Sequence, residues 1–386
     1  MRIRSLLTAI FVTVLIATLA PIAPVHATPG GSDLTPGDVL TSSAMAVYLD
    51  PLKITRLPVN AWRIEYRSTS AVGQPITVSG SVLVPKTSYS GVRPLVAYAP
   101  GTHGLGDRCA PSAQMAAGTD QELPIAQSAL ALGWAVVMTD YEGLGTPGDH
   151  TYMVGRSQGH AVLDSLRAAV RGPFGLSPSA PMGIWGYSQG GLSATWAAEL
   201  QPAYAPELPL RGVAAGGVPA DMTVMADSLD GSAFFAFLAM AGIGMQAAYP
   251  ELKLESYLTA AGRRMFTAYR ESCMFEALVP FAFHRMRDFA TGDVLKRPDW
   301  QERMARQRPG NVAPIVPMML WHGYNDQVVP YRVASSLRDR YCGMGVKVNW
   351  ETYRIAEHVG GVIQAVPSVL SWLDGRFTGR TAQSNC

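Results

Sequence analysis

One serine lies in a setting that could make it a nucleophile. Ser188 is the central residue of a Gly-Tyr-Ser-Gln-Gly stretch at positions 186–190, between an apolar run and a run of helix-compatible residues. Its flanking glycines leave room for a tight turn that a Cβ atom would crowd. A strand, a sharp turn and a helix in this order expose the serine hydroxyl above the edge of a parallel sheet. The spacing predicts a nucleophilic Ser188, and the alternative is an incidental serine in a glycine-rich loop.

A serine hydroxyl is a weak nucleophile near neutral pH, so it needs a base, and the base needs an anion to orient it. In a strand–turn–helix arrangement the acid and then the histidine follow the serine along the chain. Asp326 comes directly after a predicted strand, and His358 lies between a later strand and a helix. We predict that Asp326 is the acid and His358 the base. The alternatives are a turn aspartate and a helix-entry histidine. His322 precedes Asp326 and is expected to be structural.

Negative charge on the carbonyl oxygen of a substrate requires hydrogen-bond donors, which form an oxyanion hole. One predicted donor is the backbone N–H of Gln189, directly after the nucleophile. The second is expected from the loop after the third predicted strand, where Thr102 is the preferred residue and His103 the next choice. An ordinary glycine-rich turn is the alternative interpretation of that loop.

Two more carboxylates end a neighbouring predicted strand. Asp140 and Glu142 belong to Thr-Asp-Tyr-Glu-Gly-Leu-Gly at positions 139–145. Such groups can act as acids and bases, but they more often cap turns. Because Asp326 already fills the acid role, we expect Asp140 and Glu142 to brace the pocket.

The elements that must position these residues form a largely parallel sheet. Apolar runs and period-two patterns predict eight strands, at residues 62–67, 76–84, 95–99, 134–139, 182–187, 211–217, 316–321 and 346–353. Amphipathic spacing predicts helices at residues 119–132, 159–171, 192–198, 333–341 and 362–377. The first two strands are expected to be antiparallel. This pattern predicts the α/β-hydrolase fold, with an eight-stranded, mostly parallel sheet.

Between the sixth and seventh predicted strands the pattern becomes helical and rich in Phe and Met. Residues 218–311 are therefore expected to form an inserted helical cap, which divides the core into residues 28–217 and 312–386. Flexible Met and aromatic side chains suit an acyl pocket. Packing of the cap onto the core is the plainer explanation of the same residues.

The 386-residue chain is 48% apolar and 16% charged, which favours a globular protein over a disordered one. Residues 1–27 have two arginines, an apolar stretch and a small final residue, typical of a secretory signal peptide cleaved after Ala27. An uncleaved anchor helix is the alternative. Loss of two arginines takes the formal charge from +2 to about 0, and we expect no nucleic-acid partner.

Four cysteines remain in a chain that is expected to be exported. Cys109, Cys273, Cys342 and Cys386 allow three pairings, of which spacing and position favour Cys109–Cys273 and Cys342–Cys386. A zinc site is the competing interpretation, but no Cys-x-x-Cys or Cys/His cluster supports it. The sequence predicts two disulfides and no metal.

Several motifs together resemble the secretory lipase family, which comprises the fungal lipase A type and its actinobacterial relatives. The resemblance lies in Gly-Tyr-Ser-Gln-Gly-Gly at 186–191, the 139–145 stretch and Cys-Ala-Pro-Ser at 109–112, and it covers most of the mature chain. It implies a secreted α/β hydrolase with a helical cap, with Ser188, Asp326 and His358 as the triad and with Cys109 bonded into the cap. The chain departs from the fungal Tyr-Asp-Ser segment near the oxyanion hole, having Gly-Thr-His at 101–103.

The expected function is a secreted serine carboxylester hydrolase, a lipase that cleaves triacylglycerols or other lipophilic esters through an acyl-enzyme on Ser188. An acyltransferase, a short-chain esterase or a peptidase would use the same triad, and a secreted binding protein with an inactive hydrolase fold is a further alternative. We expect no cofactor and no obligate protein partner. The cap is expected to contact a lipid interface.

Overall fold

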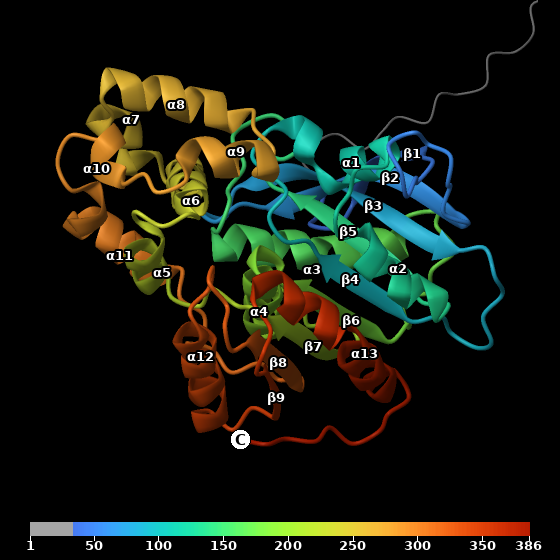
Figure 1. Ribbon diagram of the computed structural model, residues 1–386. Coiled ribbons are helices and arrows are strands. Elements are labelled where there is room, and N and C mark those ends of the chain that lie inside the picture. The colour runs from blue at the N-terminus through green and yellow to red at the C-terminus, as the bar shows by residue number, and fades with distance from the viewer. Residues whose placement is uncertain (1–33) are drawn as a thin grey trace, which may run out of the picture. The chain divides into compact units, whose positions relative to one another are not determined.

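The computed structural model describes residues 34–386 (Figure 1). Its centre is a single nine-stranded sheet in the order β1-β2-β3-β5-β4-β6-β7-β8-β9. The strands are β1 Val39–Ala44, β2 Val59–Thr69, β3 Pro75–Pro85, β4 Leu95–Ala99, β5 Ala135–Tyr141, β6 Met182–Tyr187, β7 Leu210–Gly216, β8 Met318–Gly323 and β9 Val348–Tyr353. β1, β2, β3 and β5 pair antiparallel, and the pairs from β5 onward are parallel. The predicted mostly parallel sheet is confirmed.

Helices cover both faces of this sheet. They are α1 Pro111–Ala117, α2 Leu123–Ala131, α3 Gly155–Arg171, α4 Gln189–Tyr204, α12 Tyr331–Gly343 and α13 His358–Phe377. Apolar residues of α3, α4 and α12 pack on one face, and those of α1, α2 and α13 pack on the other. The strands β4, β5, β6 and β8 are buried along their whole length, as expected for parallel strands between two helical layers.

The predicted number of strands was wrong by one. β1 lies ahead of the first predicted strand, in a stretch for which the sequence predicts no strand, and it pairs antiparallel with β2 at the edge of the sheet. Its last four residues are exposed, so the period-two pattern that marks a half-buried strand is missing. Backbone hydrogen bonds rather than side-chain burial define this strand, and a hydrophobic pattern cannot report them.

Pro317 falls inside the strand predicted at residues 316–321, but the observed strand begins directly after it. β8 begins at Met318, and the carbonyl oxygen of Pro317 accepts a hydrogen bond from the backbone N–H of Val213 at 3.1 Å. Proline lacks only the donor, so its acceptor can still join the ladder at the first position of a strand.

Between β7 and β8 the chain forms a helical insertion. Its α-helices are α5 Met222–Leu229, α6 Phe235–Ala248, α7 Leu254–Tyr257, α8 Ala260–Arg270, α9 Met274–Phe281, α10 Met286–Phe289 and α11 Pro298–Arg306. They lie together beside the sheet (Figure 1), and α6 packs against α5, α8 and α9. We call α5–α11 the helical insertion. None of the described helices is long and apolar enough to span a bilayer.

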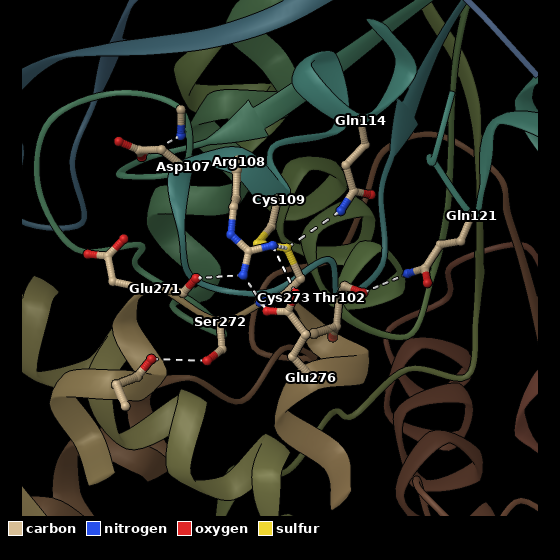
Figure 2. Close-up of a disulfide and its surroundings, with 12 residues drawn as sticks. Thr102, Asp107, Arg108, Cys109, Gln114, Gln121, Glu271, Ser272, Cys273 and Glu276 are labelled. Carbon is tan, nitrogen blue, oxygen red and sulfur yellow. Dashed lines mark hydrogen bonds and ion pairs between the residues drawn. A yellow bond between two sulfur atoms is a disulfide. The ribbon is translucent and has the colours of Figure 1, made fainter. Parts of the chain in front are cut away.

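The two favoured disulfides are both present. Cys109 and Cys273 are joined with 5.3 Å between their Cα atoms, and Cys342 and Cys386 with 5.4 Å. Cys109 ends the short 3₁₀ helix η1 Asp107–Cys109, and Cys273 is the N-cap residue of α9 (Figure 2). The first bond therefore ties the core to the helical insertion. The second ties α12 to the last residue of the chain.

Candidate active site

The turn after β6 holds Ser188 in a conformation that side chains rarely adopt. Its backbone angles are φ 57° and ψ −121°, between the end of β6 and the start of α4. A Cβ atom on Gly186 would overlap the carbonyl group of Gly190, and one on Gly190 would overlap that of Ala99. Strain of this kind persists only where the surrounding structure enforces it, and it is common at functional sites.

Register brings the predicted site residues to one edge of the sheet. Ala99 at the end of β4 pairs with Gly186 near the end of β6, and Gly323 at the end of β8 pairs with Tyr353 at the end of β9. Because parallel strands end on the same side, the segments that follow them lie close together. The structure thus gathers residues that are up to 256 positions apart, from Thr102 to His358.

Ser188, His358 and Asp326 form a hydrogen-bonded line. His358 Nε2 lies 3.1 Å from the Oγ of Ser188, and His358 Nδ1 lies 2.7 Å from an Oδ of Asp326. A carboxylate only accepts hydrogen bonds, so Nδ1 carries the proton and Nε2 is free to accept from the serine hydroxyl. The His358 side chain is 14% exposed and that of Asp326 is fully buried.

The carboxylate of Asp326 is held on both oxygens. One oxygen accepts the backbone N–H groups of Val328 at 2.9 Å and Val329 at 2.8 Å, and the other accepts from His358. Burial acts to raise the pKa of Asp326, but the hydrogen bond and positive charge of His358 outweigh it, and the pKa is lowered. Asp326 therefore stays ionised and can stabilise a charged imidazole.

His322 lies against this carboxylate. Its Nε2–H donates to the carbonyl oxygen of Val329 at 2.9 Å, and the same nitrogen is 3.4 Å from Asp326. The side chain is fully buried, and burial lowers its pKa. His322 is the last residue but one of β8, and its contacts with Val329 and Asp326 agree with the structural role that was expected.

His358 is fixed as the first residue of α13. The preceding Glu357 caps the helix by accepting the backbone N–H groups of Val359 and Gly360, and the hydroxyl of Tyr187 donates to the carbonyl oxygen of His358 at 2.8 Å. The helix thus starts four residues before the predicted position, because the cap rather than the apolar period defines the start.

Residues 100–103, here called the oxyanion loop, have their carbonyl groups engaged. The hydroxyl of Tyr141 donates to the oxygen of Pro100 at 2.9 Å, and the amide of Gln121 donates to that of Thr102 at 2.9 Å (Figure 2). The backbone N–H of Met274, in the helical insertion, donates to the oxygen of His103 at 2.9 Å. These contacts come from three separate parts of the chain.

Buried ionisable side chains also form hydrogen bonds with the backbone of the oxyanion loop. The His103 ring donates to the oxygen of Gly101 at 2.9 Å and to Asp120 at 3.2 Å, and Glu122 accepts the N–H of Gly101 at 2.8 Å. Burial acts to lower the pKa of His103, but the charge of Asp120 outweighs it and raises the pKa to about 9. Within residues 34–386, no protein group accepts the backbone N–H of Thr102 or of Gln189. Both predicted oxyanion donors therefore remain available.

Asp140 and Glu142 are engaged as braces. Asp140 accepts hydrogen bonds from the hydroxyls of Ser79 and Ser112 and from the backbone N–H of Ser112. Glu142 accepts from the hydroxyl of Ser157 and from that of Thr151. These contacts join Asp140 of β5 to β3 and α1, and Glu142, directly after β5, to α3 and the loop before it.

One residue near the nucleophile was missed from the sequence. The sequence predicts no role for His150, yet its Nδ1–H donates to the oxygen of Glu142 at 2.8 Å and its Nε2 accepts the side-chain amide of Gln189 at 3.1 Å. Burial lowers the pKa of His150 to about 4, so it is neutral and able to accept. No spacing rule connects positions 150 and 189, and only the fold could reveal the contact.

A cavity of about 390 Å³ opens beside Ser188 and His358. Its lining is mainly apolar and comes from both the core and the helical insertion, including Tyr187, Phe234, Phe237, Phe275, Leu278 and Ile363. A second, narrower cavity leads from Ser188 into the insertion, between Met222 and Leu238. Within the described residues, no three His, Cys, Asp or Glu side chains are grouped as metal ligands would be.

Comparison with known sequences gives consistent matches. The family model for secretory lipase matches residues 110–385. A probable inactive lipase of Mycobacterium tuberculosis is 30% identical over 92% of this chain and 82% of its own, and Lipase 2 of Candida albicans is 29% identical over 91% and 79%. A secreted triacylglycerol lipase of Malassezia globosa is 29% identical over 94% and 80%.

Solved structures agree with the fold. Candida antarctica lipase A in its closed state superposes with a TM-score of 0.83, at 24% identity over 93% of this chain and 86% of the other. The rice cell wall degrading esterase LipA of Xanthomonas oryzae superposes with a TM-score of 0.72, at 20% identity over 90% and 100%. The likeness to lipase A confirms the predicted α/β-hydrolase fold.

Proposed function

Since this chain belongs to the secretory lipase family and is a carboxylic ester hydrolase, we propose that it is a secreted lipase that uses Ser188 as its nucleophile. Its substrates are triacylglycerols or other lipophilic esters. The observation that carries the proposal is the line from Ser188 through His358 to Asp326 at the side of an apolar cavity.

In the proposed reaction, His358 Nε2 takes the hydroxyl proton of Ser188 while the Oγ bonds to the ester carbonyl carbon. The N–H groups of Gln189 and Thr102 bind the resulting oxyanion. The bond to the leaving oxygen then breaks, His358 returns its proton to the alcohol, and an acyl-enzyme remains. A water molecule, deprotonated by His358, then attacks the acyl carbonyl carbon, His358 returns the proton to Ser188, and the carboxylic acid is released. Asp326 keeps the imidazole oriented and stabilises its charge throughout.

The lining of the 390 Å³ cavity supports a lipophilic substrate, because apolar side chains there gain more from an acyl or alkyl group than from water. In this proposal the helical insertion acts as a cap, with residues 218–311 placed between core segments 28–217 and 312–386. The predicted signal peptide at residues 1–27 lies outside the described residues. Export is part of the proposal, supported by the family and by the secreted relative from Malassezia globosa.

Exposed apolar residues at the cavity mouth support contact with a lipid surface. Phe275 on α9 is 67% exposed and Ile363 on α13 is 61% exposed, and both line the cavity. Val279 and Val359 extend the same two helix faces and are also exposed. An apolar rim of this kind loses its exposure to water when it meets lipid. We call these four residues the apolar rim.

The relative from Mycobacterium tuberculosis is named as inactive, so catalysis is the point to test. Wild-type protein, Ser188→Ala and the control Ser336→Ala, an exposed serine on α12, would be assayed with p-nitrophenyl esters of short and long acyl chains. We expect Ser188→Ala to lose at least about 10⁴-fold in kcat and Ser336→Ala to match wild type. Equal rates from the wild type and Ser188→Ala would refute the proposal, and products formed with glycerol present would separate hydrolysis from acyl transfer.

A further inference from the structure

Thr102 and Ser188 face the same space from two sides. Both line the 390 Å³ cavity and both line the narrower cavity that leads into the helical insertion. Thr102 is only 6% exposed, so its side chain has no broad access to solvent. An ester carbonyl that reaches Ser188 must enter this shared space. Thr102 therefore borders the space that the reacting group occupies.

The hydroxyl of Thr102 has one partner, the hydroxyl of Tyr152. Their oxygens are 2.7 Å apart and both residues are buried. Two hydroxyls carry two protons, but only one proton lies between them. Within residues 34–386, neither oxygen forms a hydrogen bond with any other protein group. One O–H group of the pair is therefore left with no protein acceptor.

Elementary acidity decides which group that is. A phenol is a stronger acid than an aliphatic alcohol, so Tyr152 is the better donor and Thr102 the better acceptor. Burial raises the pKa of Tyr152, which keeps the phenol protonated. When Tyr152 donates to Thr102, the proton of Thr102 is the one left over. Tyr152 then also fixes the position of the Thr102 oxygen.

We propose that the hydroxyl of Thr102 donates a third hydrogen bond to the oxyanion of the tetrahedral intermediate, beside the two backbone N–H groups. Thr102 is then a catalytic residue through its side chain, and Tyr152 is a positioning residue. A donor without a partner in the free protein, placed where negative charge develops, costs no reorganisation when the reaction begins. The inference rests on the proposed function, in which Ser188 forms that intermediate.

The helical insertion holds the positioning tyrosine. Gly244 lies in α6, and a Cβ atom built there would overlap the backbone of Tyr152. The α6 helix therefore rests directly on this segment, and the next residue, Met153, has a positive φ of 63°. A segment this closely packed leaves Tyr152 little freedom to turn its hydroxyl away from Thr102.

The test compares Thr102→Val, which removes the hydroxyl and keeps the shape, with Thr102→Ser, which keeps the hydroxyl. We expect Thr102→Val to lower kcat for a p-nitrophenyl ester about 10²-fold with KM within about threefold. Thr102→Ser should stay within about tenfold of wild type, and Tyr152→Phe should lower kcat about tenfold. The control Thr146→Val, another buried threonine that lines neither cavity, should match wild type.

A second measurement separates catalysis from folding. Phenylboronic acid forms a tetrahedral adduct with a catalytic serine, so its inhibition constant should rise about as much as kcat falls in Thr102→Val. Melting temperatures identify any variant that fails to fold, and in that case Tyr152→Phe and Thr102→Ser carry the comparison. A kcat for Thr102→Val within threefold of wild type, or an unchanged boronate constant, overturns the inference. If Ser188→Ala is inactive in the same series while Thr102→Val is not impaired, the inference about Thr102 fails and the proposed function still stands.

Discussion

Residues around the nucleophile differ in how far the sequence could predict them. Ser188, Asp326 and His358 were predicted because chain order and strand ends fix where such groups must fall, and the structure brings their side chains within hydrogen-bond distance. His150 and Tyr152 could not be predicted, because their partners Gln189 and Thr102 are 39 and 50 positions away. A contact of that kind depends on how two loops pack, and no local pattern encodes it.

The charge of His103 predicts how stability depends on pH. Its pKa in the folded protein, about 9, lies above the ordinary value of 6.5, because Asp120 overcomes the effect of burial. A raised pKa means that the folded protein binds the proton more tightly than the unfolded chain does. The stabilisation is therefore complete below about pH 6.5 and is lost as the pH rises from about 6.5 to about 9.

The free energy of unfolding of the wild type should accordingly fall over that range, by an amount on the order of 3 kcal/mol. His103→Gln, which cannot be protonated, should show a flatter profile. Guanidinium unfolding at pH 6.5, 7.5 and 9 measures both. Parallel profiles for the two proteins would contradict a charged His103 in the folded state.

At the scale of elements, the start of α9 is bonded to the oxyanion loop, since Met274 donates its N–H to the oxygen of His103. Leu105, two residues after this loop, donates its N–H to the oxygen of Ser272 at 3.0 Å. The Cys109–Cys273 disulfide joins the same two segments of the chain (Figure 2). Arg108 also forms an ion pair with Glu276 in the first turn of α9. The helical insertion is thus one of the elements that position the loop of Thr102, the proposed second oxyanion donor.

Removing each disulfide separately should distinguish its effect on the position of the oxyanion loop from its effect on stability. In the chain-entropy model, loops of 164 and 44 residues contribute about 5 and about 4 kcal/mol, so Cys109→Ser with Cys273→Ser and Cys342→Ser with Cys386→Ser should both lower the melting temperature. Only the first pair should also lower kcat, by about tenfold. Equal kcat values for the two double variants, measured well below their melting temperatures, would show that the Cys109–Cys273 disulfide does not position the oxyanion loop.

Element boundaries were predicted less well than the elements themselves. β1 was not predicted because its side chains are mostly exposed. α13 begins at His358, four residues before its predicted start, because Glu357 caps it. In both cases backbone hydrogen bonds set the boundary, whereas sequence patterns mainly report side-chain burial.

At the scale of the whole molecule, the apolar rim joins helices that are about eighty residues apart in sequence. Phe275 and Val279 belong to the insertion, and Val359 and Ile363 belong to the core, yet three of the four line one cavity. The helical character of residues 218–311 was evident from composition and period. Which face of α9 would meet the mouth of the site was not, because a helix that is apolar on most sides gives no preferred direction.

The apolar rim predicts a dependence on the physical state of the substrate. Phe275→Ser combined with Ile363→Ser should lower activity on an emulsified long-chain triacylglycerol about tenfold more than activity on a soluble short-chain ester. Ile54→Ser with Leu52→Ser is a matched control, because both are highly exposed apolar residues that do not line the cavity. Binding to the emulsion would be measured by sedimentation. An equal loss on both substrates, or the same loss in the control, would contradict a role in lipid contact.

The linkage of the cysteines has a consequence for biogenesis. Numbered as they leave the ribosome, the four thiols pair first with second and third with fourth. If the polypeptide enters an oxidising compartment from its amino end, Cys273 is the first thiol to follow Cys109, and it is also its native partner. Cys342 and Cys386 enter later. Each disulfide can close between consecutive thiols, so we expect oxidative folding to need an oxidant but no isomerase to reshuffle mispaired bonds.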